Sequence, residues 1–134
     1  MESDEIIDRE SWENNYCLFI SILSVLAMPP LEQCNSMGNY NTAWELRTDG
    51  MDVDYLLNQC VIEFTIEQKD LMRHLSLSLH ALDTKLFING DILENNLKDM
   101  EIETWQIVRE IAKNLLTSLE SKTFENRKYL NLDY

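Results

Sequence analysis

A stretch close to the C-terminus decides the fold of this chain: Ile102-Glu-Thr-Trp-Gln-Ile-Val-Arg-Glu-Ile-Ala-Lys-Asn-Leu-Leu-Thr-Ser-Leu-Glu120. Its apolar side chains recur at steps of three and four residues, the spacing that places them on one face of an α-helix. Glu110, Lys113 and Glu120 fall on the opposite face. The pattern predicts an amphipathic helix over 102–120, with an apolar face that must pack against other elements.

Two more stretches have the helical spacing. Residues 9–28 are nearly all apolar after position 16, so we expect a helix that is largely buried towards its C-terminal end. Met28-Pro29-Pro30 should end it, because proline cannot donate to the helix ladder and disfavours the α conformation in the residue before it. A further helix is predicted over 66–86, where Thr65 and Gln68 have the spacing of a capping box. Its leucines keep the helical spacing throughout: Leu71, Leu75, Leu79, Leu82 and Leu86.

Shorter elements are expected between these helices. The pattern predicts a helix over 31–37, another over 41–49, and a helical turn or an extended piece around 53–57. The β-prone stretch 60–64 has no partner strand, so we interpret it as a linker with buried anchors. The remaining expectations are a turn at Asn89-Gly90-Asp91, weak structure at Asn95-Asn96 and Asp99, and a tail that docks through Phe124, Tyr129 and Leu130.

These elements combine into one all-α domain. The sequence predicts a single-domain helical bundle of four to six helices over residues 1–134, with residues 1–8 flexible. Hydrophobic residues make up 45% of the 134 residues. That share is enough for one core at this length, so intrinsic disorder is not expected.

The charge balance restricts the possible partners. The chain has 24 Asp and Glu against 11 Lys and Arg, a formal net charge of −13. Residues 1–60 hold much of this excess, with Arg9 and Arg47 as their basic residues. Nucleic acids and anionic membranes attract clustered Lys and Arg, so neither is an expected partner. The charge favours solubility or a basic protein partner.

The cysteines and the N-terminal sequence indicate a cytoplasmic protein. Cys17, Cys34 and Cys60 match no metal-binding spacing, and we expect them to be reduced and mostly buried. The longest apolar run, 17–28, falls short of the roughly 20 residues that a membrane-spanning helix needs. The acids that precede this run argue against a signal peptide, because signal peptides begin with positive charge.

The sequence offers little for catalysis. His74 and His80 lie on different faces of one predicted helix, where they cannot share a metal ion. The isolated glycines Gly38, Gly50 and Gly90 exclude a glycine-rich phosphate loop. We therefore expect no catalytic residue, no metal site and no cofactor.

Acids crowd around one glycine, in Asp49-Gly-Met-Asp52-Val-Asp54. Their order does not match a calcium-binding EF-hand loop. They form either a solvated loop or a protein-binding surface, with a metal site or acid–base pair as a third interpretation. Interfaces favour Tyr and Trp at the centre and charge around them, so the candidate partner-binding residues are Tyr40, Glu45, Asp49, Asp52, Asp54 and Tyr55. Trp44 is assigned to the core rather than to the interface, as are Trp12 and Trp105.

The residues around these acids resemble a known family. The matching stretch begins as Cys34-Asn-Ser-Met-Gly-Asn-Tyr-Asn-Thr-Ala-Trp-Glu-Leu46 and continues with Asp49, Tyr55-Leu-Leu57, Thr104-Trp105 and Glu125-Asn-Arg127. It is similar to small acidic bacterial immunity proteins of polymorphic toxin and contact-dependent inhibition systems, and residues 38–46 are its specific part. The resemblance implies a non-enzymatic, cytoplasmic protein that binds and neutralises a cognate toxin. It implies no catalytic residues.

The predicted function is therefore that of an immunity protein. The acidic chain would be steered onto a basic toxin, such as a nuclease, and would cover its substrate-binding surface. Two other classes stay open. One is an acidic adaptor or regulatory protein that binds another basic protein, and the other is a metal-dependent hydrolase that uses Asp49, Asp52 and Asp54.

Overall fold

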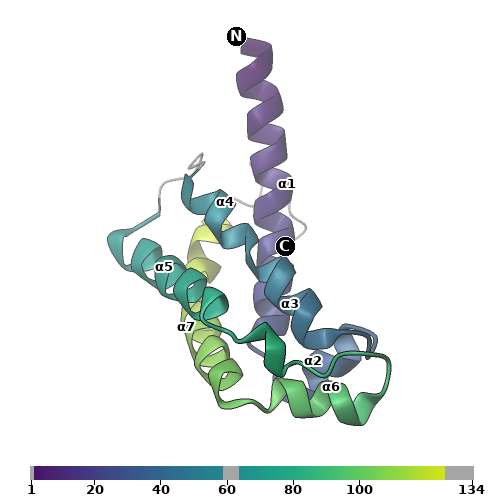
Figure 1. The fold of residues 1–134 in the computed structure, drawn as a ribbon. Helices are drawn as coiled ribbons and strands as arrows, with labels where there is room; N and C mark the ends of the chain where they lie inside the picture. The colour runs from purple at the N-terminus through teal and green to yellow at the C-terminus, as the bar shows by residue number, and fades with distance from the viewer. Residues whose placement is uncertain (1, 59–63, 126–134) are drawn as a thin grey trace.

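The computed structural model describes the backbone of residues 2–58 and 64–125 and the side chains of residues 14–58 and 64–120. Within these ranges the chain forms helices and no strand. The predicted all-α helical bundle is therefore confirmed. Each helix buries one apolar face against its neighbours, and the arrangement in Figure 1 follows from that requirement.

The three longest helices form the centre of the bundle, and three of the shorter helices close one end. In chain order the elements are α1 (Glu2–Leu26), α2 (Pro30–Ser36), α3 (Thr42–Gly50), α4 (Asp52–Asn58), α5 (Ile66–His80), the 3₁₀ helix η1 (Thr84–Leu86), α6 (Leu93–Met100) and α7 (Glu103–Glu125). α7 packs against α5 and α1, and α3 packs against α1. Figure 1 shows α5 and α7 on one side of α1, and α2, α3 and α6 grouped where α1 ends. The flexibility expected of residues 1–8 stays a prediction.

The core is built from the apolar faces that the sequence pattern marks. The stripe predicted over 102–120 is confirmed, because α7 fully buries Trp105, Val108, Ala112, Leu115 and Leu119. The facing helices α1 and α5 contribute Tyr16, Phe19, Leu23, Met72, Leu75 and Leu79. Burying one large apolar side chain contributes roughly 1.5–3 kcal/mol. Contacts among these three helices therefore supply much of the stability. Trp12, also assigned to the core, lies outside the described side chains.

The helix predicted over 66–86 begins where expected but ends early. The capping box is confirmed: the amide of Gln68 donates to Thr65 Oγ1 at 3.1 Å, and the amide of Thr65 donates to Gln68 Oε1 at 2.9 Å. The predicted end at residue 86 is wrong, because α5 stops at His80. The leucine spacing continues past the helix: Leu82 turns back into the core, whereas Leu86 on η1 is 58% exposed.

The weak structure predicted at Asn95-Asn96 and Asp99 is also wrong. These residues belong to α6, and the side chains of Asn96 and Asp99 are buried. Sequence spacing treats a buried polar side chain as a surface one, because it cannot show which distant backbone groups the side chain will bind. α6 packs against α2 and α3. Its buried Asn96 accepts a hydrogen bond from the amide of Thr42 at the start of α3 and not from solvent.

The short elements of the first half follow the sequence closely. α2 and α3 match the helices predicted over 31–37 and 41–49, and the segment around 53–57 is helical as α4. Phe64, at the end of the predicted linker, is buried and stacks on Tyr16 with ring centroids 6.2 Å apart. The rest of that linker lies outside the described residues, as do Tyr129 and Leu130 of the C-terminal tail and the side chain of Phe124.

Arg109 of α7 is a charged side chain within the core, with 4% of its surface exposed. Its guanidinium donates to the carbonyl oxygen of Met100 at 2.8 Å and to the side-chain oxygens of Gln33 and Gln106 at 3.2 and 3.0 Å. Gln33 in turn donates to the carbonyl oxygen of Leu26 at 3.0 Å. Met100 and Leu26 end α6 and α1, where carbonyl groups lack helical partners. We call this pair the Arg109–Gln33 hub. Arg109, on α7, binds the free carbonyl group at the end of α6, and Gln33, on α2, binds the one at the end of α1.

Replacing Gln33 by alanine tests the hub. Gln33→Ala removes one acceptor from a buried cation and one donor from the end of α1. We therefore expect the free energy of unfolding to fall by about 2 kcal/mol. Urea unfolding followed by circular dichroism measures the change. Asn114→Ala on the exposed side of α7 is the control and should shift the value by less than about 0.5 kcal/mol. Equal stability of the two variants would contradict the role of the hub.

Candidate functional site

α3 has one buried face and one exposed face. Its buried residues are Thr42, Ala43, Leu46 and Gly50. A Cβ atom at Gly50 would lie 2.9 Å from Cδ1 of Leu79 and 3.4 Å from Cδ1 of Leu26, so glycine allows α3 to approach α5 and α1 closely. This close packing determines which residues of α3 face solvent.

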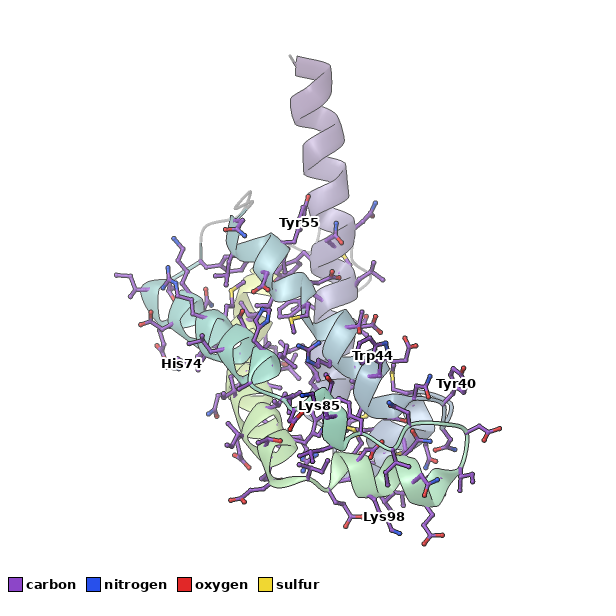
Figure 2. The ribbon with its side chains drawn as sticks, viewed as in Figure 1. Tyr40, Trp44, Tyr55, His74, Lys85 and Lys98 are labelled. Atoms are coloured by element: carbon purple, nitrogen blue, oxygen red, sulfur yellow. The ribbon has the colours of Figure 1, made fainter. Side chains whose placement is uncertain are left out.

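Two aromatic side chains are exposed at the start of α3. Trp44 is 44% accessible, and Tyr40, just before the helix, is 59% accessible. The assignment of Trp44 to the core is therefore wrong. Ala43 and Leu46 are the fully buried residues of this turn, and at 100° per residue Trp44 lies outside the buried sector. Figure 2 shows Tyr40 and Trp44 on the same edge of the molecule.

Three acids follow Trp44 along α3 and the start of α4: Glu45, Asp49 and Asp52, here called the acid row. Burial raises the pKa of Asp49, and the charges of Glu45 and Asp52 raise it further. Burial also raises the pKa of Asp52. The fold therefore holds like charges together in a partly desolvated place, which is unfavourable in the unbound protein.

Asp54 and Tyr55, the other two predicted binding residues, lie on α4 together with Asp52. Asp54 faces α5, where its carboxylate accepts a hydrogen bond from Ser76 Oγ and lies 3.0 Å from His80 Nε2. Tyr55 is half-buried, and Figure 2 shows it beside α1, well away from Tyr40. The predicted set therefore divides: Tyr40 lies just before α3, the acid row follows along α3 to the start of α4, and Asp54 holds α4 against α5.

Ser76, Asp54 and His80 have the composition of a catalytic triad but not its connectivity. In a triad the imidazole stands between hydroxyl and carboxylate and takes the proton of the hydroxyl. Here the carboxylate of Asp54 stands in the middle and accepts from Ser76. The cluster therefore links α4 to α5 and lacks the order of groups that activates the serine of a triad. His74 is exposed on α5, as Figure 2 shows.

The other reactive groups are buried or scattered. Cys34 is fully buried, and burial raises the pKa of its thiol, so it is not poised as a nucleophile. Cys17 is half-buried, and Cys60 lies outside the described residues. In the described part of the chain, no group of three or more His, Cys, Asp or Glu is arranged to hold a metal ion.

The sequence did not reveal a buried amide that joins α3 to a distant loop. Asn96 of α6 is fully buried, and its Oδ1 accepts from the amide of Thr42 at 3.0 Å. It thereby caps α3, whose own N-cap residue, Asn41, makes no capping hydrogen bond with its side chain. Its Nδ2 lies within 3.1 Å of three carbonyl oxygens, those of Asn39, Gly90 and Ile92. The sequence signal for this contact is the number of asparagines in the two segments that it joins, 39–41 and 89–96.

Asp99 and Asn41 hold the same loop. Asp99 is 1% exposed and accepts from the amides of Ile88 and Asn89 at 2.7 and 2.8 Å. The amide of Asn41 donates to the carbonyl oxygen of Gly90 at 2.9 Å, and the amide of Gly90 donates to Asn41 Oδ1 at 2.7 Å. Positive φ, which asparagine tolerates better than most residues, occurs at Asn39, Asn41 and Asn89. We call Asn41, Asn96 and Asp99 the loop clamp.

None of the helices in the described part of the chain combines the length and the apolar character needed to cross a bilayer. No protein-family model matches the chain, and neither a curated protein nor a solved structure matches it. The function must therefore be inferred from the geometry of the site and from the sequence.

The raised pKa of Asp49 predicts a dependence of stability on pH. A carboxyl group whose pKa is higher in the folded chain binds its proton more tightly when folded. It therefore destabilises the fold as the pH rises from its ordinary pKa of 3.8 through the raised value. Asp49→Asn should increase the free energy of unfolding at pH 7 by roughly 0.5 kcal/mol or less after solvent screening. The gain should disappear near pH 3, where the wild-type carboxyl is protonated in both states.

Urea unfolding of both proteins at pH 7 and pH 3 measures this difference. Glu120→Gln on the exposed side of α7 is the control, because it removes one carboxylate away from the acid row. A gain of the same size at both pH values would show that the carboxylate charge is not its cause.

Proposed function

We propose that this chain is a non-enzymatic immunity protein that binds a cognate bacterial toxin through a basic surface of the toxin and neutralises it by covering that surface. One observation carries the proposal: an exposed tryptophan, Trp44, stands beside the acid row on a helix whose other face is fully buried. An apolar anchor next to clustered acids fits a partner that presents apolar groups among cations.

The aromatic side chains support an interface. Trp44 and Tyr40 each leave about half of their surface in water, where that surface contributes nothing to folding. Aromatic rings bury a large area and lose little conformational entropy on binding, which is why they dominate the affinity of many interfaces. Two of them at the start of one helix provide a natural centre for contact.

The acid row supports a basic partner. The carboxylates of Asp49 and Asp52 are partly desolvated in the unbound chain, and Asp49 is also repelled by its acidic neighbours, so ammonium or guanidinium groups of a partner would relieve an existing cost. The net charge of −13 would also speed the encounter with a basic protein. A nuclease toxin needs a basic surface to hold its substrate, so covering that surface would block its activity.

The resemblance to immunity proteins points to the same residues. Its specific part, 38–46, includes Tyr40, Trp44 and Glu45. Proteins of that kind are cytoplasmic and inhibit by tight binding, and we propose the same location and mode of action here. The partner to test is the purified product of the gene that neighbours this chain's own gene.

Reversing the charge of the acid row tests the electrostatic part of the proposal. The triple variant Glu45→Lys, Asp49→Lys, Asp52→Lys should slow association with the neighbouring gene product at least about tenfold at low salt. Its association rate should also depend less on salt, because the attraction that salt screens has been removed. Surface plasmon resonance at several ionic strengths measures both effects.

A matched triple variant separates the acid row from overall charge. Glu103→Lys, Glu110→Lys and Glu120→Lys change the net charge equally, on exposed positions of α7. If both triples slow association to the same extent, the acid row is not the contact. If the wild-type chain does not bind the neighbouring gene product, the proposed function is wrong.

Truncating Trp44 tests the apolar part. Trp44→Ala should raise the dissociation rate roughly 30-fold and leave the association rate nearly unchanged, because a buried anchor acts after the encounter. Leu77→Ala, at a 66% exposed position on α5, is the control and should change neither rate. An unchanged dissociation rate in Trp44→Ala would remove this side chain from the interface.

A further inference from the structure

The segment from the end of η1 to the start of α6 exposes a cluster of aliphatic side chains. The accessible fractions are 58% for Leu86, 53% for Ile88, 56% for Ile92 and 39% for Leu93. Single exposed aliphatic residues are common on proteins and need no explanation. A group of them within one short segment is a patch, and such patches mark contacts with other molecules.

The backbone beneath this patch is fixed by the loop clamp. The amides of residues 88–90 donate to clamp side chains, and the carbonyl oxygens of Gly90 and Ile92 accept from one. Water could satisfy these groups in an ordinary surface loop. Instead the buried side chains of Asn96 and Asp99 do so, and they hold the loop in one conformation. A loop that is already ordered loses little entropy when it binds.

The patch adjoins the exposed aromatic residues. Asn41 and Gly90 are hydrogen-bonded through their backbones, so Tyr40 lies one residue away from the loop. Figure 2 shows Tyr40 beside this loop, with Trp44 on the same edge of the molecule. The aliphatic loop and the two aromatic residues therefore belong to one surface.

We propose that the loop Leu86–Leu93 is the second half of the surface that binds the basic protein partner. Together with Tyr40 and Trp44 it forms the apolar centre of the interface, and the acid row forms a charged rim. The inference rests on the proposed function and adds to it a rigid contact element about fifty residues further along the chain.

The charge of the whole chain favours a basic partner over a second copy of this chain. At the loop itself the exposed acids Asp91 and Glu94 are matched by the exposed bases Lys85 and Lys98, with Lys98 3.6 Å from Glu94, so the loop contributes mainly apolar contact. Two copies with a net charge of −13 each would repel one another when brought face to face. The complementary surface is therefore an apolar side chain or ridge that meets the loop, with Lys or Arg of the partner placed to meet the acid row.

Replacing the central aliphatic residues tests the inference. The double variant Ile88→Ser, Ile92→Ser should raise the dissociation rate of the neighbouring gene product at least about tenfold. The matched control Leu77→Ser, Ile107→Ser alters side chains of similar exposure on α5 and α7 and should leave the rate unchanged. Urea unfolding of both variants shows whether the fold is intact.

Each outcome has a distinct meaning. If the wild-type chain binds and Trp44→Ala weakens binding while the loop variant does not, the loop has no role and the proposed function stands. If the wild-type chain does not bind, both proposals fail. If sedimentation shows a wild-type dimer that the loop variant abolishes, the loop joins two copies of the chain, and the inference is wrong.

Hydrogen exchange tests the rigidity of the loop without a partner. The amides of Ile88 and Asn89 donate to Asp99 and should exchange slowly in the unbound chain. Exchange as fast as in an unstructured peptide would overturn the claim that the loop is ordered before binding.

Discussion

The buried guanidinium of Arg109 restricts the bundle to one arrangement. In the described part of the chain, the oxygens that accept from it are uncharged and come from α2, from α7 and from the end of α6. A buried cation that loses such acceptors costs far more than a lost apolar contact, because it cannot be rehydrated. The apolar faces of α1, α5 and α7 would stabilise several similar packings. The Arg109–Gln33 hub selects the packing in which α1 and α6 both end beside it.

α6 connects the Arg109–Gln33 hub to the candidate site. Its last residue, Met100, is tied to the core, whereas Asn96 and Asp99 reach the start of α3 and the loop before α6. The positions of Tyr40 and Ile88 therefore depend on a charge in the core that neither of them touches. Buried polar residues of this kind add to the uniqueness of a fold as well as to its stability.

The parts that sequence could predict are those set by local chemistry. The stripe of α7, the capping box at Thr65 and the proline stop after α1 depend on neighbours in the chain, and all three are found. The misplaced features depend on tertiary contacts. Leucine spacing could not reveal that α5 ends at His80. The polar composition of α6 did not predict a helix, because its Asn96 and Asp99 bind backbone groups far away in the sequence or in the preceding loop. At the candidate site, composition pointed to Tyr40, the acid row and Asp54 as candidates, and only the packing of α4 against α5 shows that Asp54 bonds to Ser76.

Asn96 joins residues 39–42 to the loop before α6, so the candidate surface is built from two segments that are far apart in the sequence. Residues 39–42 leave the ribosome before Asn96, so during synthesis the carbonyl of Asn39 and the amide of Thr42 first lack the partner that Asn96 provides in the folded chain. Contacts of such sequence separation form late, with the rest of the tertiary structure. A peptide that spans 34–46 would carry the right side chains without the geometry that presents them. A partner that recognises this surface would therefore bind only the folded domain. A partially synthesised or unfolded chain would not compete for the partner.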